Sequence, residues 1–203
     1  MKYITDLADL DMEGTYTYAD YLTWRFEQSV ELIKGKIFKM LPAPNVKHQR
    51  ISRELLRHFL AYFKKDSPCE LCVAPFDVRL LDKKKSKSSK ANQDIYTVVQ
   101  PDICVICDKD KLDEQGCIDA PDLIIEILSP GNSKKEMKTK YALYEESGVQ
   151  EYWVVYPSEH SLLQFILNQE GKYVLKSAFA EDEVFQAHIF PELSIDLAEV
   201  FVD

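Results

Sequence analysis

The sequence has no apolar run long enough to cross a membrane. A membrane-spanning helix needs roughly 18 to 20 predominantly apolar residues, and no stretch of the 203 residues approaches this. The first residues, MKYITDLADLDMEG, also lack the apolar segment of a secretory signal peptide. We therefore expect no membrane association and a cytoplasmic location.

The sequence has five cysteines, which is an odd number. This number does not suit the disulfide framework of a small secreted domain, so we expect buried free thiols. Cys69-x-x-Cys72 and Cys104-x-x-Cys107 match the spacing of a four-cysteine zinc site. However, Cys104 and Cys107 fall three residues apart in one apolar strand, so their side chains should point to opposite faces. The pattern therefore disfavours zinc.

Basic residues are outnumbered, because 25 Lys and Arg face 34 Asp and Glu and give a net charge of −9. Indiscriminate binding to nucleic acid needs the opposite balance. Lysines are nevertheless concentrated in KKKSKSSK (83–90) and KKEMKTK (134–140), and arginines recur along a helix face. A local basic surface can coexist with an acidic remainder. The candidate nucleic-acid contacts are Arg50, Arg53, Arg57 and Lys134.

The chain shows no repeat and no interdomain linker, and its length fits one domain over residues 1–203. We expect an α/β (α+β) fold in which a mixed β-sheet is flanked by helices, with β-hairpins near both ends. The expected helices cover 17–26, 48–64 and 133–147, the last opened by a capping box of Ser133 and Glu136. The expected strands cover 29–33, 36–40, 72–81, 97–108, 121–130, 151–157, 162–167 and 173–179.

Glu126 is the most informative residue, because it lies inside LIIEIL, where every neighbour is aliphatic. An unpaired carboxylate there is very costly, so it must be paired, protonated or bound to a metal. Asp102 begins the preceding apolar strand, and adjacent strands lie about 4.8 Å apart. The two carboxylates could share one ion, although a structural ion pair accounts for the burial equally well.

A helix over 134–147 places one lysine on its apolar side. Lys140 falls inside the arc of apolar residues, whereas two other lysines of the segment fall outside it. An inward lysine needs an anionic partner, and the nearest candidates are Glu126 and Asp102. The alternative is a lysine that extends past apolar neighbours to water. Two carboxylates and a lysine suit the metal-assisted hydrolysis of a phosphodiester.

Several segments occur in a fixed order: VELIKGKIFKM, QPDICVI, IEILSP, KYALYEESGV, EYWVVYP and FPELSIDL. Together they resemble the Uma-type restriction endonuclease family, a bacterial group first classified as a domain of unknown function. The resemblance spans nearly the whole chain. It implies the PD-(D/E)XK nuclease fold, DNA as substrate, Mg²⁺ or Mn²⁺ as cofactor, and a homodimer.

The resemblance also implies roles for single residues. Asp102, Glu126 and the backbone carbonyl of Ile127 would bind the metal. The PD-(D/E)XK motif has its lysine two residues after the acid, but this chain has Leu128 at that position. The resemblance implies that Lys140, on the following helix, takes over the role of that lysine. Three further positions resemble the family pattern and form a candidate secondary site: Glu31, His48 and Gln100. Glu31 could instead be an exposed strand acid, and His48 a helix N-terminal residue.

Other classes of function are weaker. A nuclease fold that has lost activity and serves as an interaction module is the main alternative to the enzyme. A serine or cysteine hydrolase is disfavoured because the chain has no G-x-S-x-G motif. Asp122 repeats the Pro-Asp pair, but it lies four residues before Glu126 on one strand, about 13 Å away, so it cannot share the same metal.

Overall fold

Two six-stranded mixed sheets form most of the computed structural model, which describes residues 3–40, 45–83, 90–131 and 134–202. The first sheet has the order β2 (Lys36–Lys39), β1 (Val30–Ile33), β5 (Val98–Val99), β4 (Val78–Arg79), β8 (Gly116–Ile118) and β7 (Leu112–Asp113). The second has the order β12 (Tyr173–Ala180), β11 (Ser161–Leu167), β10 (Glu151–Tyr156), β9 (Leu123–Ile127), β6 (Ile103–Ile106) and β3 (Glu70–Val73). The predicted class, mixed strands flanked by helices, is confirmed.

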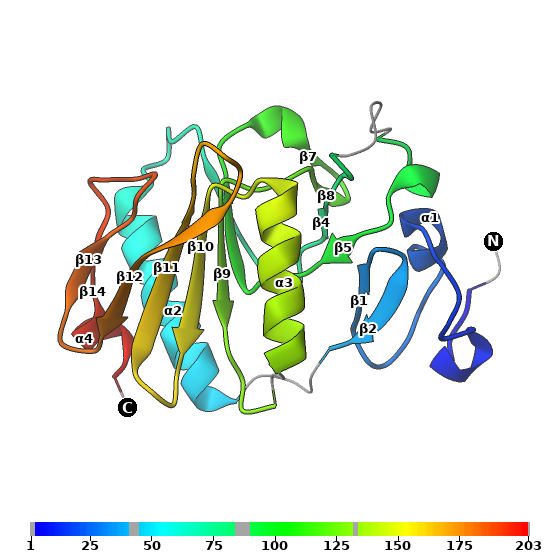
Figure 1. Ribbon diagram of the computed structural model, residues 1–203, viewed down its shortest axis with the longest axis horizontal. Coiled ribbons are helices and arrows are strands. Elements are labelled where there is room, and N and C mark those ends of the chain that lie inside the picture. The colour runs from blue at the N-terminus through cyan, green and yellow to red at the C-terminus, as the bar shows by residue number, and fades with distance from the viewer. Residues whose placement is uncertain (1–2, 41–44, 84–89, 132–133, 203) are drawn as a thin grey trace.

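Four α-helices and a small hairpin accompany the sheets (Figure 1). They are α1 (Tyr18–Tyr21), α2 (Val46–Tyr62), α3 (Lys134–Ser147) and α4 (Leu197–Val200), with β13 (Val184–Gln186) paired to β14 (Ser194–Asp196). Within the described segments, every helix is too short or too polar to span a membrane. Ser133, the expected cap of α3, and most of the lysine-rich segment 83–90 lie outside the described residues.

The predictions of continuous strands over 72–81 and 97–108 are wrong. The first is divided at Pro75 into β3 and β4, and the second at Pro101 into β5 and β6. Proline has no N–H group to donate to a strand ladder. At each proline the chain therefore leaves one sheet and enters the other, and the second crossing leaves Asp102 just before β6.

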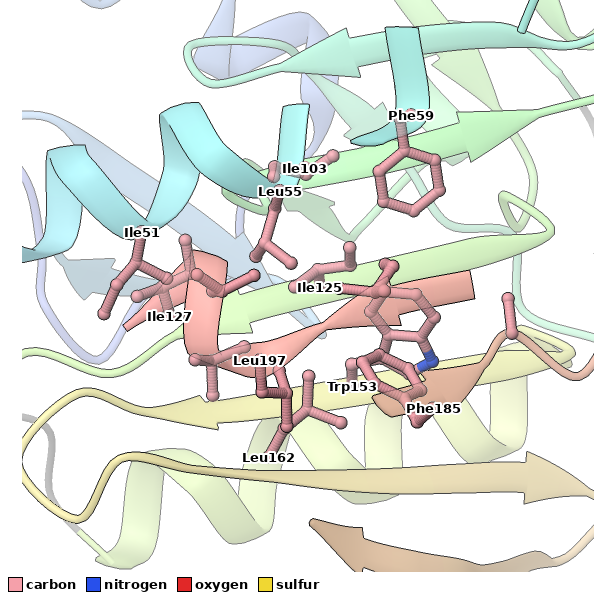
Figure 2. Close-up of a cluster of buried hydrophobic side chains, with 14 of the residues drawn as sticks. Ile51, Leu55, Phe59, Ile103, Ile125, Ile127, Trp153, Leu162, Phe185 and Leu197 are labelled. Carbon is pink, nitrogen blue, oxygen red and sulfur yellow. The ribbon is translucent and has the colours of Figure 1, made fainter. Parts of the chain in front are cut away.

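The helix α2 covers one face of the second sheet. Ile51, Leu55 and Phe59 recur every four residues and are almost completely buried. Figure 2 shows these side chains pointing from the helix towards Ile125 and Trp153 in the sheet. The apolar period of the sequence therefore predicted this helix face, and the structure confirms it.

The helix α3 covers the opposite face (Figure 1), and its Leu143 and Tyr144 belong to the same buried hydrophobic cluster as Ile124 of β9. Every residue of β9 is buried, as its unbroken apolar run predicted. Alternate residues of the strand face opposite sides, so Glu126 shares the α3 side with Ile124. The helix ends before Gly148, whose positive φ of 82° suits the predicted stop.

The first helix is shorter than expected. Thr17 caps it as predicted, but α1 ends at Tyr21 rather than at Phe26. The backbone N–H of Ile4 donates to Thr23, and that of Arg25 donates to Ile4. Pairing with the N-terminal segment therefore replaces further helical turns.

The expectation of buried free thiols is wrong for Cys69 and Cys107, which form a disulfide, but it holds for Cys104 and Cys117, which are buried and free. The strands β3 and β6 are antiparallel, and their register places these two residues opposite each other just beyond the paired segment. Cys72 and Cys104 pair in the same register but contribute to the core on the α3 side, whereas Cys69 and Cys107 lie on the α2 side. The prediction that Cys104 and Cys107 face opposite sides is confirmed, and the four cysteines do not converge on a zinc site.

Leu55→Ala should lower the free energy of unfolding by about 2–5 kcal/mol, because it leaves a cavity between α2 and the sheet. Urea denaturation measures this change. Leu60→Ala is the matched control, since Leu60 lies on the same helix and is 67% exposed, and it should cost less than about 0.5 kcal/mol. Equal losses for the two variants would contradict the described packing of α2.

Candidate active site

The strand register brings Asp102 and Glu126 together. The antiparallel strands β6 and β9 pair Ile103 with Ile125, and continuing this register by one residue places Asp102 opposite Glu126. The Asp102 carboxylate is held on both sides: Oδ2 accepts a 2.7 Å hydrogen bond from the N–H of Ile127, and Oδ1 lies 3.2 Å from His48 Nε2. Asp102 therefore has a fixed orientation beside Glu126.

Lys140 is buried between two carboxylates. Its Nζ donates to Glu126 Oε1 at 2.9 Å and to Glu31 Oε1 at 3.0 Å. The Tyr144 hydroxyl donates to the same Glu126 oxygen at 2.6 Å. Lys140 and Glu126 are each only 9% exposed. Lys140 therefore lies on the inward face of α3 that the helical period predicted, next to the carboxylate that it was expected to approach.

Burial and neighbouring charges shift the pKa values of this cluster. Burial raises the pKa of Glu126 to about 7; Lys140 opposes this shift, and the negative charges of Asp102 and Glu31 add to it. Burial lowers the pKa of Lys140, but the attraction of Glu126 and Glu31 outweighs that effect and raises the pKa above its ordinary value. Lys140 therefore stays charged, and its buried ammonium contacts two carboxyl groups, those of Glu126 and Glu31.

Glu31 and Gln100 come to this cluster from the first sheet. Glu31 is only 4% exposed, so its interpretation as an exposed strand acid is wrong. Its Oε1 accepts a 2.9 Å hydrogen bond from the backbone N–H of Gln100. The Gln100 side chain in turn donates to Asp77 Oδ1 at 2.8 Å. The contact with Gln100 fixes the carboxylate that shares Lys140 with Glu126.

His48 comes to the site from the opposite side, at the first turn of α2. Asn45 caps this helix by accepting the His48 N–H at 2.9 Å. The His48 side chain is buried against Asp102, and among the described residues its Nδ1 has no hydrogen-bond partner. The position is therefore both a helix N-terminal residue and a contact of the candidate metal ligand.

These residues line one pocket of about 100 Å³. Leu128 lines it too, at the position where the plain nuclease motif has a lysine. Tyr144, which contacts Glu126, was not identified as a site residue from the sequence. Its one available signal was its place four residues after Lys140, on the same helix face.

The remaining candidates lie on the surface. Arg50, Arg53 and Arg57 are exposed on α2, but Arg53 and Arg57 both pair with Glu54, and Arg57 also pairs with Glu199. The positive charge of Arg53 and Arg57 is thus largely offset by neighbours. Lys134 is exposed at the start of α3. Asp122 lies at the other end of β9, where it accepts hydrogen bonds from Cys107 and Gln150.

Mixed sheets flanked by helices, with paired acids and a lysine in one pocket, define a nuclease-like protein. The family model described as "Uma2: Putative restriction endonuclease" matches residues 18–198, and the chain belongs to this family. It is also similar to the crystal structure of a putative nuclease belonging to DUF820 from Anabaena variabilis. The identity is 23% with a TM-score of 0.69, over 92% of this chain and 97% of that one. This second likeness shows the fold. No curated protein matches the sequence.

Lys140→Met should lower the free energy of unfolding by about 3–5 kcal/mol at pH 8, because two buried carboxylates lose their cation. The folded-state pKa of Glu126 already exceeds its ordinary 4.5, so ionisation of this group favours the unfolded state. The loss should therefore be largest above pH 7 and shrink as the pH falls towards 4.5. Urea denaturation at pH 8 and pH 5 measures both effects.

Lys138→Met is the control, because Lys138 lies on the exposed side of the same helix. It should change stability by less than about 0.5 kcal/mol at either pH. A Lys140→Met variant as stable as the wild type at pH 8 would contradict the buried ion cluster.

Proposed function

We propose that this protein is a divalent-metal-dependent endonuclease that hydrolyses DNA phosphodiester bonds, and that Asp102, Glu126 and Lys140 are its catalytic residues. The observation that carries the proposal is the burial of Lys140 against Glu126, with Asp102 opposite, in one pocket. Membership in the restriction endonuclease family favours the same chemistry. The homodimer implied by the family pattern remains a prediction.

The donor groups of the pocket suit a hard cation. Within the described part of the chain, no three His, Cys, Asp or Glu side chains are arranged to hold a metal. Mg²⁺ needs fewer, because it is usually bound through one or two carboxylates and keeps several waters. We assign Asp102, Glu126 and the carbonyl of Ile127 as ligands of Mg²⁺ or Mn²⁺. Lys140 and Tyr144 both use Glu126 Oε1, so Oε2 is the proposed ligand atom.

Each of these residues then has a role in the proposed hydrolysis. When bound, the metal supplies Lewis-acid polarisation of the phosphate and lowers the pKa of a water molecule. Asp102 keeps its orientation through Ile127 and His48. The Lys140 ammonium orients the attacking water or stabilises negative charge that develops on the phosphate. Glu31 holds Lys140 in place from the first sheet. Because the donors are fixed before substrate arrives, little reorganisation is needed during the reaction.

Asp102→Asn and Glu126→Gln should each reduce cleavage on the order of 100-fold or more, because each removes a ligand charge while keeping the side-chain shape. The measurement is the rate of cleavage of a panel of duplex, branched and single-stranded DNA with Mg²⁺ or Mn²⁺. EDTA should abolish cleavage by the wild type.

Asp122→Asn is the matched control, because Asp122 also follows a proline but lies at the far end of β9. This variant should keep a rate within a few-fold of the wild type. If the wild type cleaves no DNA in the panel with either metal, the enzymatic proposal fails. A nuclease fold that serves as an interaction module would then be the better account.

A further inference from the structure

A second, shallow groove lies beside the active-site pocket and has a volume of about 250 Å³. Half of its lining residues are aromatic: Tyr141, Tyr156 and Phe165 are partly exposed, and Tyr152 is buried beneath them. The ring centroids of Tyr141 and Phe165 are 5.1 Å apart and the ring planes are nearly perpendicular, so the two rings pack edge to face. Two exposed lysines, Lys134 and Lys138, also line the groove, and none of its described lining residues is acidic.

The groove is continuous with the pocket. Met137 and Tyr152 line both of them. The parallel register of β9 and β10 pairs Glu126 with Val154, which also lines the groove. Neighbouring strands lie about 4.8 Å apart, so the groove begins one strand away from the proposed metal ligand. A part of a ligand that binds in this groove would therefore lie next to the part that binds in the active-site pocket.

Aromatic rings beside lysines match the two parts of a nucleotide. An unstacked base places its flat face on an aromatic side chain, and lysines contact the phosphates of the same strand. A base inside an intact duplex is already stacked and must leave the helix to reach such rings. The combination of rings and cations therefore favours a strand with an unpaired nucleotide over an intact duplex.

We propose that this groove binds the base of a nucleotide adjacent to the scissile phosphate, with Lys134 and Lys138 contacting the flanking phosphates. The preferred substrates are then single strands or DNA with an unpaired nucleotide next to the cut. The inference rests on the proposed function for the position of the cut, but base binding itself is independent of cleavage.

The test uses the full chain carrying Glu126→Gln, in which cleavage should be slow enough to measure binding alone. Fluorescence anisotropy gives the Kd for a labelled 20-nucleotide single strand and for the blunt duplex of the same sequence, without metal and with Mg²⁺. Binding to the single strand should be at least about tenfold tighter. In this background Tyr156→Ala should weaken single-strand binding about tenfold, because one stacking surface is lost, and Tyr156→Phe should keep the affinity.

A second test uses a double lysine variant and does not depend on Tyr156, which is half-buried. Lys134→Ala with Lys138→Ala should weaken single-strand binding and reduce its dependence on salt concentration. Lys64→Ala is the control, because Lys64 is exposed just beyond α2, on the other side of the second sheet. Its affinity and its salt dependence should match those of the parent protein.

Equal affinity for single strand and duplex, or no effect of both Tyr156→Ala and the double lysine variant, would overturn the proposal for the groove. An apolar dye that binds there and is not displaced by the oligonucleotide would indicate another occupant and would also overturn it. If the groove proposal fails in either way, cleavage of duplex DNA by the wild type would still support the proposed nuclease function. Single-strand binding that depends on Tyr156, with no metal-dependent cleavage, would support base binding in the groove and overturn the proposed nuclease function.

Discussion

The buried contact of Lys140 with Glu126 and Glu31 is the interaction on which the rest of the structure depends. The three residues come from α3, from the second sheet and from the first sheet, so one ammonium joins three parts of the fold. Removing such charges from water costs several kcal/mol each and is offset only when each charge has a partner. Removing one member would therefore leave a buried charge without its partner. The same constraint fixes a lysine and two carboxylates at the wall of a pocket, where the proposed metal and substrate phosphate would bind.

The two proline crossings explain why the pocket lies between the sheets. If β5–β6 were one continuous strand, Asp102 would lie within a single ladder rather than at the start of a strand. Because the chain changes sheets at Pro75 and Pro101, Asp102 lies at a strand end and faces Glu126 across the register. The helix α2 then supplies His48 from one side, and α3 supplies Lys140 from the other. The core under both helices holds this arrangement together.

The sequence predicted the parts of the site that depend on local periodicity. The helical arc found Lys140, and the aliphatic surroundings of Glu126 identified a carboxylate in need of a partner. Contacts between distant segments were beyond such reasoning: nothing local shows that Tyr144 donates to Glu126, and Glu31 entered only through resemblance to a family. The disulfide of Cys69 and Cys107 depends on the register of two strands that are far apart in sequence. The strand breaks had a local signal in proline, but the apolar residues on either side favoured continuity.

The proposed reaction requires Asp102 and Glu126 to bind a divalent metal in the pocket that Lys140 borders. Diffraction from crystals soaked in Mn²⁺, recorded at a wavelength where manganese scatters anomalously, tests this directly. We expect one strong anomalous peak within coordination distance of both carboxylates and of the Ile127 carbonyl, and its loss in the Asp102→Asn variant. Metal binding by Asp102 and Glu126 would be contradicted if the pocket shows no such peak at saturating Mn²⁺, or if the peak persists without the Asp102 carboxylate.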